Sequence, residues 1–188
     1  LAGSMGSLGV ILEVSLKVLP VAPATATLRF EMDEGAAIQR LNEWAAQPLP
    51  LNASAWWDGT LLLRLRGAQA AVSAACQRLG GETILAHQAE PFWEGLRDQR
   101  DEFFHKARAA VQTGASLWRV SVPQTAAPLK LAGEQLIEWG GGQRWWCTPS
   151  PATAVREAAR QAGGHATRFH GPADGPVFTP LSPVQERV

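Results

Sequence analysis

The chain has 188 residues, enough for one domain with a sizeable core or for two small ones. Lysine plus arginine and aspartate plus glutamate both number 17, and the resulting zero net charge excludes the broad basic field of proteins that bind nucleic acid or anionic membranes. No apolar run approaches the roughly 18 residues of a membrane span, and the two cysteines lack metal-type spacing, which favours free thiols in a reducing compartment. We therefore expect a cytoplasmic protein with no nucleic-acid partner and no direct membrane insertion.

Residues 1–9 contain three glycines and two serines, and they run directly into an alternating apolar and polar stretch, Val10 to Leu19, which predicts a strand. Glycine and serine let backbone N–H groups approach a ligand without a clash from Cβ, although a tight turn is the simpler alternative. No strand precedes this segment in the sequence. We therefore expect residues 1–20 to be the end of another domain.

The next segment predicts the order βαββαβ, which is a ferredoxin-like arrangement. Asp33 is a suitable N-cap for its first helix, and Asp58-Gly59 is a strong signal for a hairpin. Two glycines close its second helix. The expected elements are a strand at 25–32, a helix at 34–47, a hairpin within 53–67, a helix at 68–81 and a strand at 82–86.

The same order recurs in the C-terminal part of the chain. The expected elements there are a strand at 115–123, a short or degraded helix at 127–133, a hairpin within 134–149, a helix at 151–164 and a strand at 165–171. The fold class is thus predicted as α+β, with duplicated ferredoxin-like halves at about 25–86 and 115–170 and an antiparallel sheet covered by helices. A chance similarity between the two halves is the alternative.

A strongly helical connector, residues 90–111, is expected between the halves, with apolar side chains on one face. Two tryptophan pairs, Trp56-Trp57 and Trp145-Trp146, lie in predicted strands. Adjacent strand residues point to opposite sides, so one member of each pair should face the second side of the sheet. That side would be covered either by helices or by another domain or subunit.

The leader reads G-S-x-G-S-L-G-V-I over residues 3–11, and it resembles the segment that lies against the flavin nucleotide in vanillyl-alcohol-oxidase/PCMH-type FAD-linked oxidases. Within that family, four further blocks are similar to the C-terminal half of the FAD-binding subunit of bacterial glycolate oxidases. These blocks are "EPFWEGLRDQRDEFF", "LIEWGGGQRWWCTP", "GGHATRFHG" and "VFTPLSP". The resemblance covers nearly the whole chain in order.

The resemblance implies that residues 1–20 are a remnant of an FAD-binding domain and that residues 21–188 form a C-terminal cap or substrate domain. In the intact protein, FAD would lie against six residues, mainly through their backbone: Gly3, Ser4, Gly6, Ser7, Gly9 and Ile11. This chain by itself is expected to lack FAD and to be inactive.

The same resemblance implies a complex that oxidises glycolate, or another small 2-hydroxy acid, to the 2-oxo acid. A second flavin subunit and an iron–sulfur subunit would be its partners. A peripheral position at the inner face of the membrane, reached through those partners, is left open.

No residue is predicted to be catalytic and no metal site is expected, because the four histidines, His87, His105, His165 and His170, show no converging ligand pattern. Arg119 and Arg144 could face a carboxylate substrate or form salt bridges at the rim. The alternative function is a non-catalytic ferredoxin-like domain for ligand sensing or protein interaction. The glycine-rich leader favours the flavoprotein hypothesis, because a ligand-sensing or interaction domain would not need a glycine-rich leader.

Overall fold

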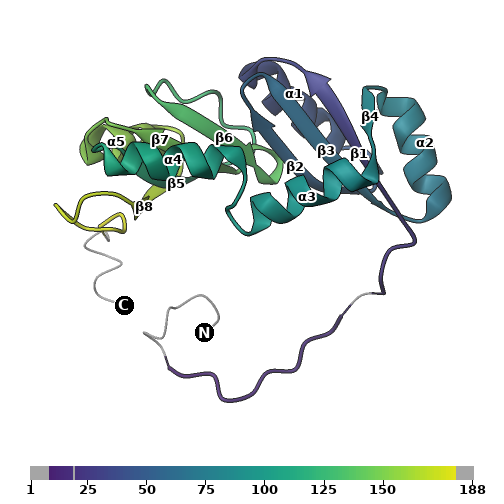
Figure 1. Cartoon of the computed structure of the whole chain (residues 1–188), viewed down its shortest axis with the longest axis horizontal. Coiled ribbons are helices and arrows are strands. Elements are labelled where there is room, and N and C mark those ends of the chain that lie inside the picture. The colour runs from purple at the N-terminus through teal and green to yellow at the C-terminus, as the bar shows by residue number, and fades with distance from the viewer. Residues whose placement is uncertain (1–8, 19, 181–188) are drawn as a thin grey trace.

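The computed structural model describes residues 9–18 and 20–180. Its centre is one eight-stranded sheet in the order β4-β1-β3-β2-β6-β7-β5-β8, with helices on both faces (Figure 1). Every pair of neighbouring strands is antiparallel. The predicted α+β class with an antiparallel sheet is therefore confirmed. Among the described residues, no helix is both long and apolar enough to cross a membrane.

The first half of the sheet follows the predicted order of elements. The Asp33 carboxylate accepts a hydrogen bond from the backbone N–H of Ala36 at 2.8 Å and so caps the first helix. Asp58 and Gly59 take φ values of 48° and 78°, as a two-residue hairpin turn requires. The elements are β1 (Ala24–Glu31), α1 (Glu34–Ala45), β2 (Leu51–Trp57), β3 (Thr60–Gly67), α2 (Gln69–Leu79) and β4 (Glu82–Ile84).

The connector consists of two helices, α3 (Ala86–Arg97) and α4 (Glu102–Gln112). The break falls at Gln99, whose φ of 56° is not helical. Asp101 then starts α4, since its carboxylate accepts a hydrogen bond from the Phe104 N–H at 3.2 Å. The turn between the two helices lets both lie on the same side of the sheet (Figure 1).

The second half of the sheet lacks the short helix predicted at 127–133, and that prediction is wrong. Residues 122–133 form an irregular connection, in which Pro123 and Pro128 disfavour a helix and the buried Leu129 fills the space beside the sheet. The elements are β5 (Ser116–Ser121), β6 (Glu134–Glu138), the 3₁₀ turn η1 (Trp139–Gly141), β7 (Gln143–Thr148), α5 (Ala152–Gln161) and β8 (His165–His170).

Helices cover both faces of the sheet, which decides between the two alternatives for the tryptophan pairs. Trp56 packs in the core beneath α1 and α2, and Trp146 packs in the core beneath α5. Their neighbours Trp57 and Trp145 point to the opposite face and pack with residues of α3 and α4. The two members of each pair thus lie on opposite faces, as predicted, and the second face is covered by the connector helices.

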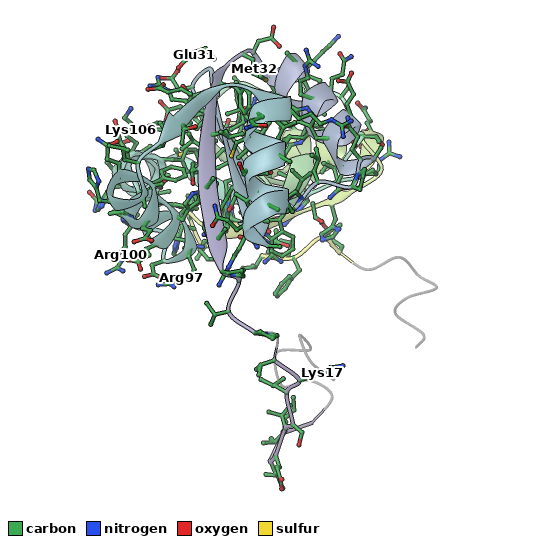
Figure 2. All side chains as sticks on the ribbon, turned by 90° about the vertical axis from the view of Figure 1, so that its right-hand side faces the viewer. Lys17, Glu31, Met32, Arg97, Arg100 and Lys106 are labelled. Atoms are coloured by element: carbon green, nitrogen blue, oxygen red, sulfur yellow. The ribbon has the colours of Figure 1, made fainter. Side chains whose placement is uncertain are left out.

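The strand predicted at Val10–Leu19 is absent from the described part of that segment. Residues 10–18 take part in no strand pairing, and Val10 and Leu12 are 84% and 94% exposed. A strand needs a neighbour to satisfy its backbone N–H and C=O groups, and these residues run away from the sheet instead (Figure 1). Lys17, labelled in Figure 2, lies well away from the domain.

Candidate functional site

The structure describes two of the six residues predicted to contact FAD, Gly9 and Ile11; Gly3, Ser4, Gly6 and Ser7 lie outside the described residues. Gly9 has a φ of +143°, which side chains rarely adopt, and no heavy atom lies within 4 Å of the position that a Cβ would take. A side chain at position 9 would therefore be strained by the backbone conformation and not by a neighbouring atom. Ile11 is 54% exposed, and neither residue is among those that line the three main cavities of the described part of the chain.

The largest cavity described forms where the two halves of the sheet separate. Only three residue pairs join β2 to β6, from Ala55 opposite Glu138 to Trp57 opposite Leu136. Beyond Glu138 the chain turns away into η1, while β2 continues back to Leu51. The divergence leaves a cavity of about 670 Å³ beside β2, a volume suited to a small-molecule ligand.

Aromatic side chains form the inner wall of this cavity, which we name the seam cavity. Trp93 of α3, Phe104 of α4 and Trp145 of β7 are each less than 10% exposed. Ala53 lies opposite Arg64 in the pairing of β2 with β3, and its small side chain leaves space beside the longer side chain of Arg64. The other lining residues are Leu41, Ala45, Leu51, Asn52, Ser54, Leu63, Leu96, Arg97, Gln99, Gln124, Glu138, Trp139, Gly140 and Gln143.

Arg64 is a partly buried cation of the seam cavity, and its side chain is held from two sides. Its Nε donates a hydrogen bond to the Asn52 Oδ1 at 2.6 Å, and its Cζ lies 4.9 Å from the ring centroid of Trp93. The Trp93 ring is itself fixed by a hydrogen bond from its Nε1 to the Thr27 Oγ1 at 3.0 Å. Burial, and secondarily the charge of Arg66, lowers the pKa of Arg64.

Glu138 supplies the opposite charge, from the far side of β2. Its Oε2 accepts hydrogen bonds from the Trp145 Nε1 at 2.6 Å and from the Gln143 Nε2 at 3.2 Å. Burial raises the pKa of the Glu138 carboxyl, and these hydrogen bonds offset the effect only in part; the nearby Asp101 carboxylate raises this pKa further. The seam cavity thus combines a guanidinium, a carboxyl group and an aromatic wall.

The raised pKa of Glu138 predicts a pH dependence of stability. When folding raises the pKa of an acid, the free energy of unfolding falls as the pH rises from the pKa of the unfolded state through the pKa of the folded state. Glu138→Gln removes this titration and keeps an acceptor for Trp145. We therefore expect its free energy of unfolding, relative to wild type, to increase from pH 4 to pH 7. Urea unfolding across this range measures the change, and the control is Glu134→Gln at an exposed position. The prediction would be contradicted if the free energy of unfolding had the same slope against pH in wild type and in both variants.

Trp139 stands at the rim of the seam cavity in an unusual conformation. Its φ is +53°, which is rare for a bulky residue, and its side chain is 71% exposed. The turn is held by hydrogen bonds from the Gln124 Nε2 to the Trp139 carbonyl at 3.1 Å and from the Gly140 N–H to the Ser54 Oγ at 2.9 Å. A strained backbone therefore presents a large apolar ring beside the cavity.

The other residues singled out from the sequence lie outside this cavity. Arg144 is fully buried and bonded to backbone carbonyls, so it faces no substrate, whereas Arg119 is exposed on β5. The four histidines are exposed, and the described residues contain no group of histidine, cysteine or acidic side chains arranged to hold a metal ion. Cys76 and Cys147 are free thiols.

Comparison with known proteins gives one clear relationship. The chain is 41% identical over 182 residues, 97% of its length, to the glycolate oxidase subunit GlcE of Escherichia coli (strain K12). The chain is a relative of GlcE. It spans about half the length of GlcE, since the matched segment covers 48% of that protein. No protein-family model and no solved structure matches the chain.

The match to GlcE confirms the resemblance predicted from the sequence motifs, and its coverage is consistent with a C-terminal half. Sequence reasoning did not identify Arg64, Glu138 or Trp139 as parts of one site. One available signal was an arginine inside the apolar strand "LLLRLRG", and another was the block "EWGGGQ", which turns β6 away from β2.

Proposed function

We propose that this chain is the cap portion of an FAD-linked oxidoreductase subunit in a complex that oxidises glycolate to glyoxylate. The observation that carries the proposal is the 41% identity to GlcE over 97% of the chain. In the oxidation, glycolate loses two electrons and two protons. FAD, when bound, supplies the acceptor for the two electrons.

The leader supports this proposal physically. Its apolar residues Val10, Leu12, Val14, Leu16 and Val18 recur at every second position and are all at least 64% exposed. Such alternation is typical of a strand with one face against a core, and it would be satisfied by a sheet of a flavin domain. Gly9 would then bring its backbone to the flavin, together with Gly3, Ser4, Gly6, Ser7 and Ile11.

The roles of partner subunits belong to the same proposal. A second flavin subunit would carry out the hydroxy-acid chemistry, an iron–sulfur subunit would accept the electrons, and any contact with a membrane would pass through these partners. The cap domain itself is not expected to contribute a catalytic group. It would shape the space over the flavin and form subunit contacts.

We also propose that the sheet combines two related ferredoxin-like halves. The strand order 4-1-3-2 of the first half is mirrored by β6-β7-β5-β8 in the second. A glycine following the second helix approaches the carbonyl of the first strand in each half, Gly81 at Arg29 and Gly164 at Ser121. The connection at 122–133 then replaces the helix that the second half lacks.

A chimera tests the proposed function. The segment of GlcE that matches this chain would be replaced by this chain, and the chimera would be expressed in E. coli lacking GlcE. Glycolate oxidation would be measured in these cells, and the absorption spectrum would be recorded on the purified chimera. The expected results are a yellow protein with flavin absorption bands and restored glycolate oxidation. A folded but colourless chimera would contradict the flavin role, and a yellow chimera without glycolate oxidation would contradict the substrate and partners.

Two variants of the leader sharpen this test. Gly9→Val introduces a β-branched side chain where φ is +143°, and it should weaken FAD binding by the chimera at least about tenfold. Lys17→Gln, a change of side chain in the same segment, should leave FAD affinity unchanged. Equal FAD affinities of the two variants would argue against a flavin contact at Gly9.

A further inference from the structure

The seam cavity differs from the proposed flavin contact in position and in chemistry. It lies between β2, η1 and the connector helices, while residues 9–18 run away from the domain. Its polar groups are side chains on regular elements, Arg64 on β3 and Glu138 on β6. A site built from two strands and two helices is well fixed in space.

Arg64 has donors that the protein leaves uncommitted. Its Nε is bonded to Asn52, and among the described residues it forms no ion pair with a carboxylate. Arg97, the other arginine of the lining, donates to the Asp98 carboxylate through its Nε at 2.8 Å and its Nη2 at 3.2 Å. In Figure 2, Arg97 and Arg100 lie near each other at the edge of the domain, and Asp98 bonds both.

A guanidinium with a bonded Nε presents the parallel N–H groups of its two terminal nitrogens, which match the two oxygens of a carboxylate. Phosphate fits less well, because it carries more charge and the same cavity contains the carboxyl group of Glu138. A ligand with one negative charge would balance the charge of Arg64, the lining arginine that has no ion pair among the described residues. The Glu138 Oε1 can accept a hydrogen bond from a donor group on the ligand, since the hydrogen bonds from Trp145 and Gln143 both go to Oε2.

The aromatic wall selects the rest of the ligand. Trp93, Phe104 and Trp145 form the inner surface, and Trp139 stands exposed at the rim. Aromatic rings prefer to stack on or meet the edge of other flat rings. The backbone of Trp139 is strained, and glycine would adopt the same φ freely, so the position of the ring itself needs a reason beyond folding.

We propose that the seam cavity binds a small aromatic carboxylate, with the carboxylate on Arg64 and the ring between the aromatic wall and Trp139. This inference goes beyond the proposed oxidoreductase function and does not depend on it. The site needs no flavin, so its test uses the 188-residue chain without FAD. A failure here leaves the chimera result unaffected.

Calorimetric titration with two acids and a neutral analogue tests the proposal. Phenylacetate or indole-3-acetate should bind wild type with a Kd at or below about 1 mM, and 2-phenylethanol should bind at least about tenfold more weakly than phenylacetate. Absence of binding by both acids would overturn the proposal. Inorganic phosphate that displaces phenylacetate at equal concentration would overturn the assignment to a carboxylate.

Variants separate ligand contacts from folding. Arg64→Gln should abolish the preference for phenylacetate over 2-phenylethanol, while Arg66→Gln, an exposed arginine further along the same face of β3, should retain it. Trp139→Gly should weaken both ligands yet raise the Tm, because it removes backbone strain. An unchanged preference in Arg64→Gln, or full affinity in Trp139→Gly, would sink the proposed binding mode.

Discussion

Replacing Arg144 with methionine is expected to lower the free energy of unfolding by about 3–5 kcal/mol, a loss large enough to unfold much of a marginally stable domain. Arg144 is fully buried, and its guanidinium donates to three backbone carbonyls: Gly141 at 3.1 Å, Ala127 at 2.9 Å and Ala126 at 2.5 Å. Methionine keeps the apolar stem and removes every donor. The carbonyls then lie in the interior with fewer partners, at a cost of about 1–3 kcal/mol for each one left unsatisfied.

The effect should be large because Arg144 holds the connection that replaces a helix. Residues 122–133 have few backbone partners of their own, and Arg144 joins them to β7 and η1. Glu34, whose Oε1 lies 3.9 Å from the Arg144 Nη1, adds a weak ion pair from α1. Removing the arginine should therefore loosen the core beneath α5 as well.

Urea unfolding measures this prediction, and Arg119→Met is the matched control. Arg119 also lies in a strand, but it is exposed and bonds to no side chain or carbonyl in the described part of the chain, so its replacement should change stability by no more than about 0.5 kcal/mol. Arg144→Lys should fall between the two, since an ammonium cannot span three carbonyls. If Arg144→Met and Arg119→Met unfold at the same urea concentration, the proposed role of Arg144 is wrong.

These two arginines illustrate what the sequence can and cannot decide. Arg119 lies in "LWRVS" and Arg144 in "GQRWW", so an apolar residue follows each of them in a predicted strand. The sequence allows either one to bind a carboxylate. Their different environments depend on which side of the sheet each faces and on what covers it. The carbonyls that bind Arg144 come from a loop and a turn, and no local pattern announces that contact.

Local signals predicted the elements that are decided locally. The Asp33 cap, the Asp58-Gly59 turn and the double glycine after α5 involve residues within one turn of the chain, and the structure contains all three. The short helix at 127–133 and the strand at 10–19 were predicted from pattern alone. In the first segment Pro128 disfavours a helix, and the carbonyls of Ala126 and Ala127 bond to Arg144 instead. In the second, residues 10–18 have no neighbouring strand with which to pair their backbone groups.

The seam cavity depends on long-range contacts, so the sequence could not place it. Its position follows from the pairing of Ala55 with Glu138, which joins strands from the two halves of the chain. The cavity opens because β6 ends there, at the first residue of a Gly-rich turn. The tryptophan pairs gave a partial clue, since one member of each had to reach the face on which Trp145 lines the cavity.

Gly164→Ala is the second substitution expected to cost on the order of 3 kcal/mol or more. A Cβ at position 164 would lie 1.9 Å from the carbonyl oxygen of Ser121 and 2.8 Å from Val122 Cγ1. The first of these atoms belongs to the backbone of β5, so no rotation of a side chain relieves the clash. Either β5 or the end of α5 must move.

The backbone around Gly164 cannot move freely, because it closes α5. The Gly164 N–H donates to the Ala159 carbonyl at 2.8 Å and the Gly163 N–H to the Arg160 carbonyl at 3.0 Å, the two bonds of a Schellman motif. Gly163 is the matched control: its φ of +79° makes alanine strained by about 1–2 kcal/mol, but a Cβ there would only touch Pro123 at 3.6 Å. Thermal and urea unfolding of both variants should therefore rank Gly164→Ala well below Gly163→Ala. The reverse order would mean that left-handed geometry, rather than the close approach of α5 to β5, makes glycine necessary here.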